Sequence, residues 1–293
     1  MAFNMTVGII GLGLIGGSMA KAIKSRTAHT VYGADLNRET LTLARLCGAI
    51  DGTLDNSGSQ NSAPAKNDKL SSCDLIMLAL RPAAAIAWTK ENAANISKNA
   101  LLCDLCGVKR AVCTELAAIA AEYGFGYIGG HPMAGREVSG FVNSRAELFD
   151  GASMILTPDA RSGPQLLETL KAFFSDIGFA ALTFTTPEEH DRIIAFTSQL
   201  AHIVSNAYVK SPEAQRRRGF SAGSYRDMTR VARLDEEMWT ELFFDNADFL
   251  TGQLEVLIGN LSEYLDALKA SDAWRLRSLL RDGREKKASA GGD

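Results

Sequence analysis

The sequence predicts an α/β fold in which a doubly wound parallel sheet is followed by an all-helical C-terminal domain. Up to residue 186, short apolar runs alternate with amphipathic segments, as strands and helices do in a parallel sheet. After that point only helical periodicity is found. We therefore expect one domain at 1–186 and a second at 187–282. The last residues, 283–293, are charged or small and predict a disordered tail.

The first domain is predicted to alternate strands and helices. Its strands are expected at 5–10, 27–35, 73–80, 99–105, 126–130, 153–158 and 180–186, and its helices at 16–24, 37–47, 109–122 and 164–178. The run CDLIMLAL at 73–80 is continuously apolar, which is typical of a parallel strand covered on both faces. Residues 55–72 contain almost no apolar side chain and predict a long mobile loop.

The second domain begins with a helix-start signal. Thr186 is a suitable N-cap, Pro187 suits the first helical position and Glu189 completes a capping box, so a helix should run to about Val209. Another helix is expected at 224–233. A third, very long helix from about Asp235 carries an apolar stripe of Trp239, Leu242, Phe243, Leu250, Leu254, Leu257, Leu261, Leu265 and Leu268. Such a stripe needs a cover, either a neighbouring helix or a second subunit.

The composition limits the classes of partner. A hydrophobic content of 46% and a charged content of 22% are ordinary for a globular protein. The formal net charge of −3 argues against a nucleic-acid or membrane-surface partner. We find neither a leader-like start nor an apolar run long enough to span a bilayer, so we expect a cytoplasmic protein.

The five cysteines are an odd number in a long chain, which fits a reducing compartment. Cys103 and Cys106 have the spacing of a redox pair or of half a zinc site. No second such pair and no suitably spaced pair of histidines accompanies them, so no metal is predicted. We expect Cys103 to pack inside a strand and Cys106 to lie beyond its end, where it could be accessible.

A glycine turn near the N-terminus indicates a dinucleotide site. The apolar strand in VGIIGLGLIGGS runs directly into Gly11-x-Gly13-x-x-Gly16. Gly11 permits the tight turn, Gly13 lets a pyrophosphate approach the backbone, and Gly16 lets the helix pack on the sheet with its amides toward the phosphates. Asp35 ends the second predicted strand, where a carboxylate can bind the ribose hydroxyls. The first domain is therefore predicted to be Rossmann-like.

The predicted cofactor is NAD, because the carboxylate of Asp35 would repel the 2′-phosphate of NADP. Arg38 follows three residues later and could soften that repulsion, so NADP remains possible. The remaining residues expected at the cofactor are Leu14, Ile15, Leu80 and Arg81.

A dehydrogenase needs a group that accepts the carbinol proton, and histidine suits that role near neutral pH. His131 directly follows a predicted strand, within GGHPMAGRE, and is the favoured candidate among four histidines. His29 precedes its strand, on the opposite side from the cofactor, and His190 in a first helical turn is expected at the surface. His202 shares a helix face with Ser198 and is either a core histidine with a backbone partner or a site residue.

Asp227 and Arg230 lie three residues apart on a predicted helix and can pair with each other. Such a pair is either structural or serves to orient Arg230 toward a substrate carboxylate, which an arginine binds in bidentate fashion.

Five motifs together resemble the prephenate/arogenate dehydrogenase family of tyrosine biosynthesis. GLGLIGGS, DLCGVKR, GGHPMAGRE, SQLAHIVSNA and RDMTRVA…MW occur in this order from about residue 5 to 245. The resemblance implies an NAD(P)-dependent dehydrogenase that oxidatively decarboxylates a cyclohexadienol. The product is 4-hydroxyphenylpyruvate from prephenate, or tyrosine from arogenate.

The resemblance also implies roles for single residues. His131 matches the catalytic histidine that binds the ring hydroxyl, Arg230 the arginine that holds the ring carboxylate, and His202 a histidine near the substrate side chain. The other residues implied in the pocket are Glu137, Ser198 and Trp239, and in the family the tryptophan can reach the pocket of the neighbouring subunit. A homodimer built through the helical domain is implied, which would cover the apolar stripe.

The chain departs from the family pattern at two positions. Gly107 stands where many members have a serine that touches the substrate hydroxyl and the nicotinamide. A water molecule or the thiol of Cys106 could take over that contact. Gln199 stands where some members have another histidine. Neither change removes the proton acceptor or the carboxylate-binding arginine.

We predict NAD-dependent oxidation of prephenate, with arogenate as the alternative substrate. The ammonium group of arogenate would need a carboxylate, for which Glu137 is a candidate, while Arg136 could hold the side-chain carboxylate. A hydroxyacid dehydrogenase or imine reductase would share the two-domain order without needing His131 in this motif. A non-catalytic NAD-sensing regulator would need a DNA- or protein-binding surface, for which the acidic balance of the chain offers little.

Overall fold

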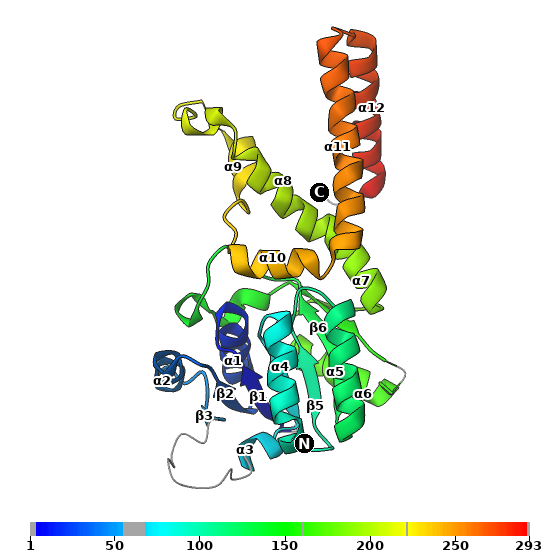
Figure 1. Cartoon of the computed structure of the whole chain (residues 1–293). Helices are drawn as coiled ribbons and strands as arrows, with labels where there is room; N and C mark the ends of the chain where they lie inside the picture. Colours follow the sequence, from blue (N-terminus) through cyan, green and yellow to red (C-terminus); the bar gives the residue numbers. More distant parts are fainter. Residues whose placement is uncertain (1–3, 55–67, 160, 221, 292–293) are drawn as a thin grey trace.

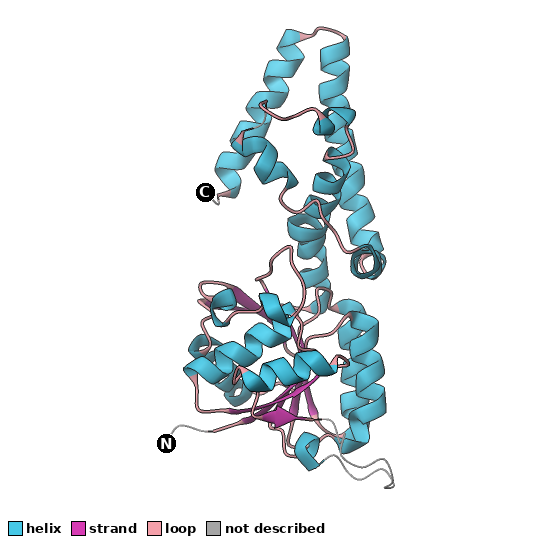
Figure 2. Cartoon of the chain, turned by 90° about the vertical axis from the view of Figure 1, so that its left-hand side faces the viewer, coloured by secondary structure: helices cyan, strands magenta, loops and turns pink. Residues whose placement is uncertain are grey.

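The computed structural model describes residues 4–54, 68–159, 161–220 and 222–291. A sheet flanked by helices forms one end of the molecule, and helices alone form the other (Figures 1 and 2). The eight strands are arranged in the order β3-β2-β1-β4-β5-β6-β7-β8. They are β1 (Thr6–Ile10), β2 (Thr30–Ala34), β3 (Gly52–Thr53), β4 (Leu75–Leu78), β5 (Leu101–Asp104), β6 (Gly126–Pro132), β7 (Ser153–Thr157) and β8 (Ala181–Phe184).

The sheet is parallel except at one position. The prediction of a parallel sheet was wrong for β7 and β8. Strand β7 runs antiparallel to β6 and pairs Gly130 with Leu156 and His131 with Ile155, and β8 is parallel to β7. The connection 133–152 contains only short 3₁₀ turns and no crossover helix, so the chain returns along the same edge in the opposite direction. The strand-to-helix order of the first half otherwise agrees with the predicted α/β class.

The helices around the sheet are α1 (Leu14–Arg26), α2 (Arg38–Leu46), α3 (Asp68–Ser71), α4 (Pro82–Asn92), α5 (Arg110–Tyr123) and α6 (Pro164–Asp176). The sequence analysis missed α4, which begins with proline at its first position and continues with helix-favouring alanines. The expected loop at 55–72 was wrong at its end, where α3 forms. Residues 55–67 of that loop lie outside the described residues.

Both faces of the sheet are covered, as expected for parallel strands. Every residue of β4 and β5 is buried. One core cluster joins the sheet to α1 and α6 through residues such as Met19 and Phe173. The other joins it to α4 and α5 through residues such as Ala85 and Leu116. This burial fixes the carboxyl ends of the central strands, where ligands bind in open α/β sheets.

The second half is helical, as predicted. A nearly continuous helical segment consists of α7 (Pro187–Ile194), a π-helical turn (Ala195–Leu200) and α8 (Ala201–Tyr208). It is followed by α9 (Gly223–Thr229), α10 (Glu236–Phe244), α11 (Ala247–Lys269) and α12 (Ala273–Ala290). In Figure 1, α11 and α12 form an antiparallel pair that extends away from the sheet. No helix within the described residues is long and apolar enough to cross a membrane.

The single long helix expected from Asp235 is in fact two helices. The chain breaks at Asn246, whose φ of −130° is not helical. Its side chain is fully buried, donates to the backbone oxygen of Asp191 and to the Gln199 amide oxygen, and accepts from Arg110. These tertiary hydrogen bonds favour the break over continuation of the apolar stripe.

The disordered tail expected at 283–293 was wrong for residues 283–290, because α12 continues to Ala290, and residues 292–293 lie outside the described residues. The helix packs against α11, where Tyr264 donates to the backbone oxygen of Leu279, and Asp272 caps its first turn. Packing on a neighbour therefore outweighs the polar composition of this segment. The end of the predicted stripe remains uncovered within the chain: Leu261, Leu265 and Leu268 expose 58%, 51% and 62% of their surface.

Candidate active site

The glycine turn has the geometry that a pyrophosphate needs. Gly11 has a φ of +89°, a conformation that other residues rarely adopt. A Cβ atom on Gly16 would overlap the carbonyl oxygen of Gly11, so α1 can approach the turn only with glycine there. Around Gly13, by contrast, an added Cβ would meet nothing within 4 Å, which leaves the backbone open to a ligand.

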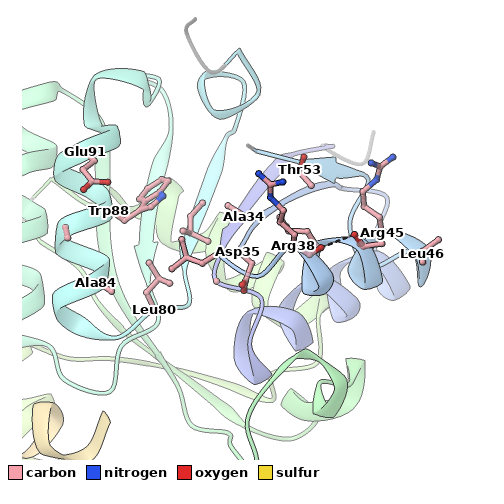
Figure 3. Close-up of a pocket in the computed structure, with 16 residues that line it drawn as sticks. Ala34, Asp35, Arg38, Arg45, Leu46, Thr53, Leu80, Ala84, Trp88 and Glu91 are labelled. Carbon is pink, nitrogen blue, oxygen red and sulfur yellow. Dashed lines mark hydrogen bonds between the residues drawn. The ribbon is translucent and has the colours of Figure 1, made fainter. Parts of the chain in front are cut away.

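Asp35 holds this turn in place. Its carboxylate accepts hydrogen bonds from the backbone N–H groups of Leu12 and Asn37, each at 2.8 Å. Each carboxylate oxygen has a further lone pair for an incoming hydroxyl. Asp35 also lines a cavity of about 1050 Å³ between α2 and α4. Figure 3 shows Arg38 and Arg45 on one side of this cavity, and Leu80, Ala84 and Trp88 on the other.

The other residues expected at the cofactor are placed less uniformly. Leu80 and Gly11 line the cavity. Leu14 and Ile15 open α1, and Ile15 packs against the core. Arg81 is the N-cap residue of α4 and is exposed. Of the eight predicted cofactor residues, Gly11, Asp35 and Leu80 line the described cavity, and the other five do not.

A buried polar network lies between β5 and β6. Lys109 is fully buried, forms an ion pair with Asp104 and donates to the backbone oxygen of Gly130 at 2.7 Å. Tyr127 donates to the other oxygen of Asp104 at 2.7 Å. Burial alone would lower the pKa of Lys109, but the adjacent carboxylate of Asp104 raises it above its ordinary value. Lys109 therefore stays protonated. Its bond to Gly130 fixes the end of β6 just before His131.

His131 lies at the end of β6, half-buried, and contacts a second histidine. Its Nδ1 is 2.8 Å from Nε2 of His190, and Nδ1 of His190 is 2.7 Å from Asp191. The expectation that His190 lies at the surface was wrong, because only 2% of it is exposed. Burial lowers the pKa of both histidines, helped at His131 by the positive charge of Lys109 and by any positive charge on His190, and opposed at His190 by the bond to Asp191. Both rings are thus neutral near pH 7.

A second cavity of about 840 Å³ opens above His131, between the segment that follows β6 and the helical part. It brings together seven of the predicted site residues: His131, Arg136, Glu137, Ser198, His202, Arg230 and Trp239. They come from three places that are far apart in the sequence. Gly107, the eighth, lies in the turn before α5 and does not line the cavity. A Cβ atom there would lie 3.5 Å from Leu242, an ordinary contact.

On the helical side of this cavity, His202 has the backbone partner that its sequence position suggested and also contacts Trp239. Its Nδ1 donates to the backbone oxygen of Ser198 at 2.8 Å, and its ring lies 4.0 Å from that of Trp239, centroid to centroid. Burial, followed by the smaller effect of Arg230, lowers the pKa of His202. His202 therefore has a backbone partner and also lines the cavity, so the two alternatives from the sequence do not exclude each other.

Arg230 lies at the open side of the cavity, where 66% of its side chain is exposed. It forms an ion pair with Glu137 instead of the expected pair with Asp227. The Asp227 carboxylate lies 4.0 Å from Arg226. Spacing along one helix suggested a local partner, but the segment after β6 brings a carboxylate from 93 residues away.

The cysteines play no part in either cavity. Cys103 packs inside β5 as expected, and the expectation that Cys106 could be accessible was wrong. The Cys106 thiol donates to the backbone oxygen of Leu80 at 3.4 Å, and burial raises its pKa well above its ordinary value. Among the described residues, no cluster of three or more metal-binding side chains occurs.

Sequence reasoning missed His190, Asp191 and Lys109. One signal for the first was available, since His190 precedes the apolar Ile194 by four residues and therefore shares its buried helix face. Asp191 and Lys109 gave no such signal, because their partners come from elements that are distant in the sequence.

Comparisons with known proteins show similarity over both halves of the chain. Residues 19–182 match the family described as prephenate dehydrogenase, nucleotide-binding domain, and residues 186–282 match prephenate dehydrogenase, dimerization domain. The chain is 30% identical over 274 residues to cyclohexadienyl dehydrogenase of Zymomonas mobilis, covering 91% of this chain and 89% of the other. It is 28% identical to prephenate dehydrogenase of Bacillus subtilis, covering 96% of this chain and 75% of the other.

A solved structure shows the same similarity in three dimensions. Prephenate dehydrogenase from A. aeolicus, in complex with hydroxyphenyl propionate and NAD+, superposes with a TM-score of 0.83. Its sequence is 25% identical, and the match covers 99% of each chain.

Proposed function

This chain belongs to the prephenate dehydrogenase family of oxidoreductases, and we propose that it converts prephenate to 4-hydroxyphenylpyruvate by NAD-dependent oxidative decarboxylation. One observation carries the proposal. The neutral His131 and the cationic Arg230 line the same cavity at the carboxyl end of β6. A proton acceptor and a carboxylate-binding group are the two requirements of a substrate that loses hydride and carbon dioxide from one ring.

The chain's own residues fit NAD. The open backbone at Gly13, the close packing of Gly16 and the free lone pairs of Asp35 suit a pyrophosphate and an adenosine ribose. When bound, NAD supplies the acceptor for the hydride. The carboxylate of Asp35 disfavours a 2′-phosphate, although Arg38 and Arg45 line the same cavity and leave NADP as a weaker second cofactor.

The protein's part in the reaction is to orient the substrate and to move one proton. His131 accepts the proton of the ring hydroxyl as hydride leaves the carbon that bears it. Loss of carbon dioxide from the opposite ring carbon leaves its electron pair in the ring, and His131 returns the proton to the phenolate oxygen. Arg230 holds the ring carboxylate beforehand, and His202 and Ser198 line the wall beside the substrate side chain.

Prephenate is favoured over arogenate by the ion pair at the mouth of the cavity. Glu137 is the carboxylate that the ammonium group of arogenate would need, but Arg230 already neutralises it. The side-chain carboxylate of either substrate would be held by Arg136, which lines the same cavity.

We also propose that the chain forms a homodimer through its helical part. The exposed apolar end of the α11 stripe at Leu261, Leu265 and Leu268 needs a cover, and the matching family is described as a dimerization domain. Light scattering from the purified protein measures the mass directly. A monomer at micromolar concentration would contradict this part of the proposal.

The activity is tested by measuring NADH formation with four pairs of prephenate or arogenate and NAD or NADP. Activity with prephenate and NAD above the other three pairs is expected. Activity with arogenate alone would reassign the substrate and point to Glu137 as the ammonium partner. No turnover with any pair, in a protein that still binds NAD, would contradict the proposed reaction.

A further inference from the structure

We propose that His190 and Asp191 are positioning residues that hold His131 in the tautomer whose Nε2 is free to accept the substrate proton. The inference rests on the proposed function of His131, and it assigns the atom at which the proton is received. Both residues come from the start of α7, 59 and 60 positions after the histidine on which they act, so they join the helical half of the chain to the end of β6.

The proton positions follow from Asp191, because its carboxylate is the one group among Asp191, His190 and His131 that cannot donate a hydrogen bond. The ionised carboxylate of Asp191 accepts hydrogen bonds and offers none. Nδ1 of His190 lies 2.7 Å from that carboxylate and therefore carries the hydrogen. In a neutral ring, Nε2 of His190 is then an acceptor.

The same reasoning extends to His131. Its Nδ1 lies 2.8 Å from the accepting Nε2 of His190, so Nδ1 of His131 carries a hydrogen as well. A neutral His131 then has an unprotonated Nε2 as its remaining ring nitrogen. In the opposite tautomer, two lone pairs would face each other across 2.8 Å, and Nε2 would already hold a proton.

Asp191 is held ionised by its surroundings. Beyond the His190 ring, the same carboxylate accepts from the backbone N–H groups of Lys109 at 2.7 Å and Arg110 at 2.9 Å, at the start of α5. The Arg110 guanidinium lies 3.4 Å away. Although burial opposes it, the bond from His190 and the two backbone N–H groups lower the pKa of Asp191. The carboxylate thus stays an acceptor over the whole working pH range.

Charged groups face the two histidines from each element packed around them. Lys109 and Asp104 lie on the sheet side as an ion pair, and Asp191 with Arg110 lies on the α7 and α5 side. On the cavity side the titratable groups are Arg136, Glu137, His202, Arg230, Arg233, Asp235 and Glu236. Burial, and to a smaller extent the charge of Lys109, disfavours a positive charge at either histidine, which keeps both rings neutral until His131 takes the substrate proton.

A further consequence concerns the protonated intermediate state of His131. When Nε2 receives the proton, Nδ1–H still points at the neutral acceptor of His190, and the carboxylate of Asp191 lies behind it. A hydrogen bond from a charged donor is stronger than one from a neutral donor, so the pair stabilises the imidazolium that forms during the reaction. Loss of His190 should therefore affect turnover more than substrate binding.

The tautomer can be observed without any substrate. The protein has four histidines, so ¹⁵N-histidine labelling gives few signals, and single replacements of His29, His131, His190 and His202 assign them. At pH 7.5 we expect His131 and His190 to show a protonated Nδ1 and an unprotonated Nε2. A protonated Nε2 on His131 would overturn the proposal. Because NADH formation is not needed, this result stands whatever substrate the enzyme uses.

The kinetic test is the replacement His190→Leu, with His29→Leu as a matched buried control. We expect kcat with prephenate and NAD to fall roughly 100-fold, within the range that general-base catalysis contributes, with KM values and NAD affinity nearly unchanged. The acid limb of kcat/KM should also move to lower pH, because the imidazolium of His131 loses its acceptor. His29, which stacks on Phe173 in the core, should leave kcat and the pH profile unchanged.

A purely structural role for His190 predicts a different pattern. The melting temperature and NAD affinity would then fall together, with no shift of the acid limb in the molecules that remain folded. That pattern, or a kcat within a few-fold of the wild type, would overturn the proposal. The conservative variant His190→Gln, whose amide can still accept from His131, should recover part of kcat and gives a second test if the leucine variant does not fold.

Discussion

The two cavities of this protein are built in opposite ways. The cavity at Asp35 depends on backbone geometry. Gly11 has a positive φ, position 16 has no room for a Cβ atom, and the carboxylate of Asp35 accepts from the backbone N–H of Leu12. The cavity above His131 depends on side chains from the end of β6 and the segment after it, from the π-helical turn with α8, and from the end of α9 to the start of α10. A nucleotide is thus bound by a short local motif, whereas the ring substrate is met by groups that only the tertiary fold assembles.

The largest effect is expected on turnover, from a change in the cavity above His131, which we call the side-chain cavity. We expect His131→Asn to lower kcat by about 10⁴-fold, the upper range for loss of a general base, because asparagine cannot accept the hydroxyl proton. NAD affinity, measured by fluorescence titration, should stay within a few-fold, since His131 does not line the cavity at Asp35. A variant that keeps a tenth of the wild-type turnover would show that His131 is not the proton acceptor.

In the cavity at Asp35, a single added methyl group should weaken NAD binding. In Gly16→Ala the new Cβ would overlap the Gly11 carbonyl oxygen, so the turn must open. We expect NAD affinity to fall about 100-fold, or about 2.7 kcal/mol, and the melting temperature to fall as well. Gly13→Ala is the matched control, because its Cβ meets only open space. It should weaken NAD binding without a loss of stability, and equal losses of stability in the two variants would contradict this account.

This contrast explains how much the sequence could predict. The glycine turn and Asp35 lie within 25 residues of one another, and their spacing alone indicates the nucleotide site. The apolar runs likewise predicted the central strands. In contrast, β7 and β8 were assigned the wrong direction, because apolar content does not encode strand direction. The break at Asn246 was missed, because its hydrogen-bond partners lie near residues 110, 191 and 199.

In the side-chain cavity, residue types could be predicted but their pairing could not. Seven residues chosen from motifs and family resemblance do line one cavity. Yet the partner suggested for Arg230 was Asp227, and His190 was expected at the surface. Both errors have one cause: helical spacing describes neighbours on the same helix, and the actual partners come from other elements. The residue chemistry is local, but the pairing depends on the tertiary fold.

Arg230→Ala tests the mouth of the side-chain cavity. Removing the guanidinium takes away the proposed partner of the ring carboxylate, and it also frees Glu137 to repel the dianionic substrate. We expect KM for prephenate to rise roughly 30-fold, about 2 kcal/mol, within the range for a charged hydrogen bond. Arg226→Ala, four residues earlier and outside the cavity, is the control. If KM changes equally in both variants, the effect is general electrostatics and not binding at this site.

Acid should destabilise the fold through its histidines. The pKa values of His29, His131, His190 and His202 are all lowered, in each case chiefly by burial. Below about pH 6.5 the unfolded chain therefore binds more protons than the folded one, and stability falls as the pH decreases. Thermal unfolding between pH 7.5 and 5 should show a decrease of several degrees. The slope should be smaller in His131→Asn, and an unchanged slope would assign the effect to other groups.

The smallest effect is expected at Gly107, where the chain departs from the family pattern. A serine Cβ would lie 3.5 Å from the Leu242 side chain, and the backbone there needs no positive φ, so the fold has room for Gly107→Ser. The Cys106 thiol is not a substitute for the missing hydroxyl, since it is buried against the Leu80 carbonyl. We expect stability to change by less than about 0.5 kcal/mol and kcat to stay within a few-fold. A large loss of turnover with NAD binding intact would mean that the reacting groups need the space that glycine leaves, and that the side-chain cavity, like the nucleotide turn, depends at this point on the backbone.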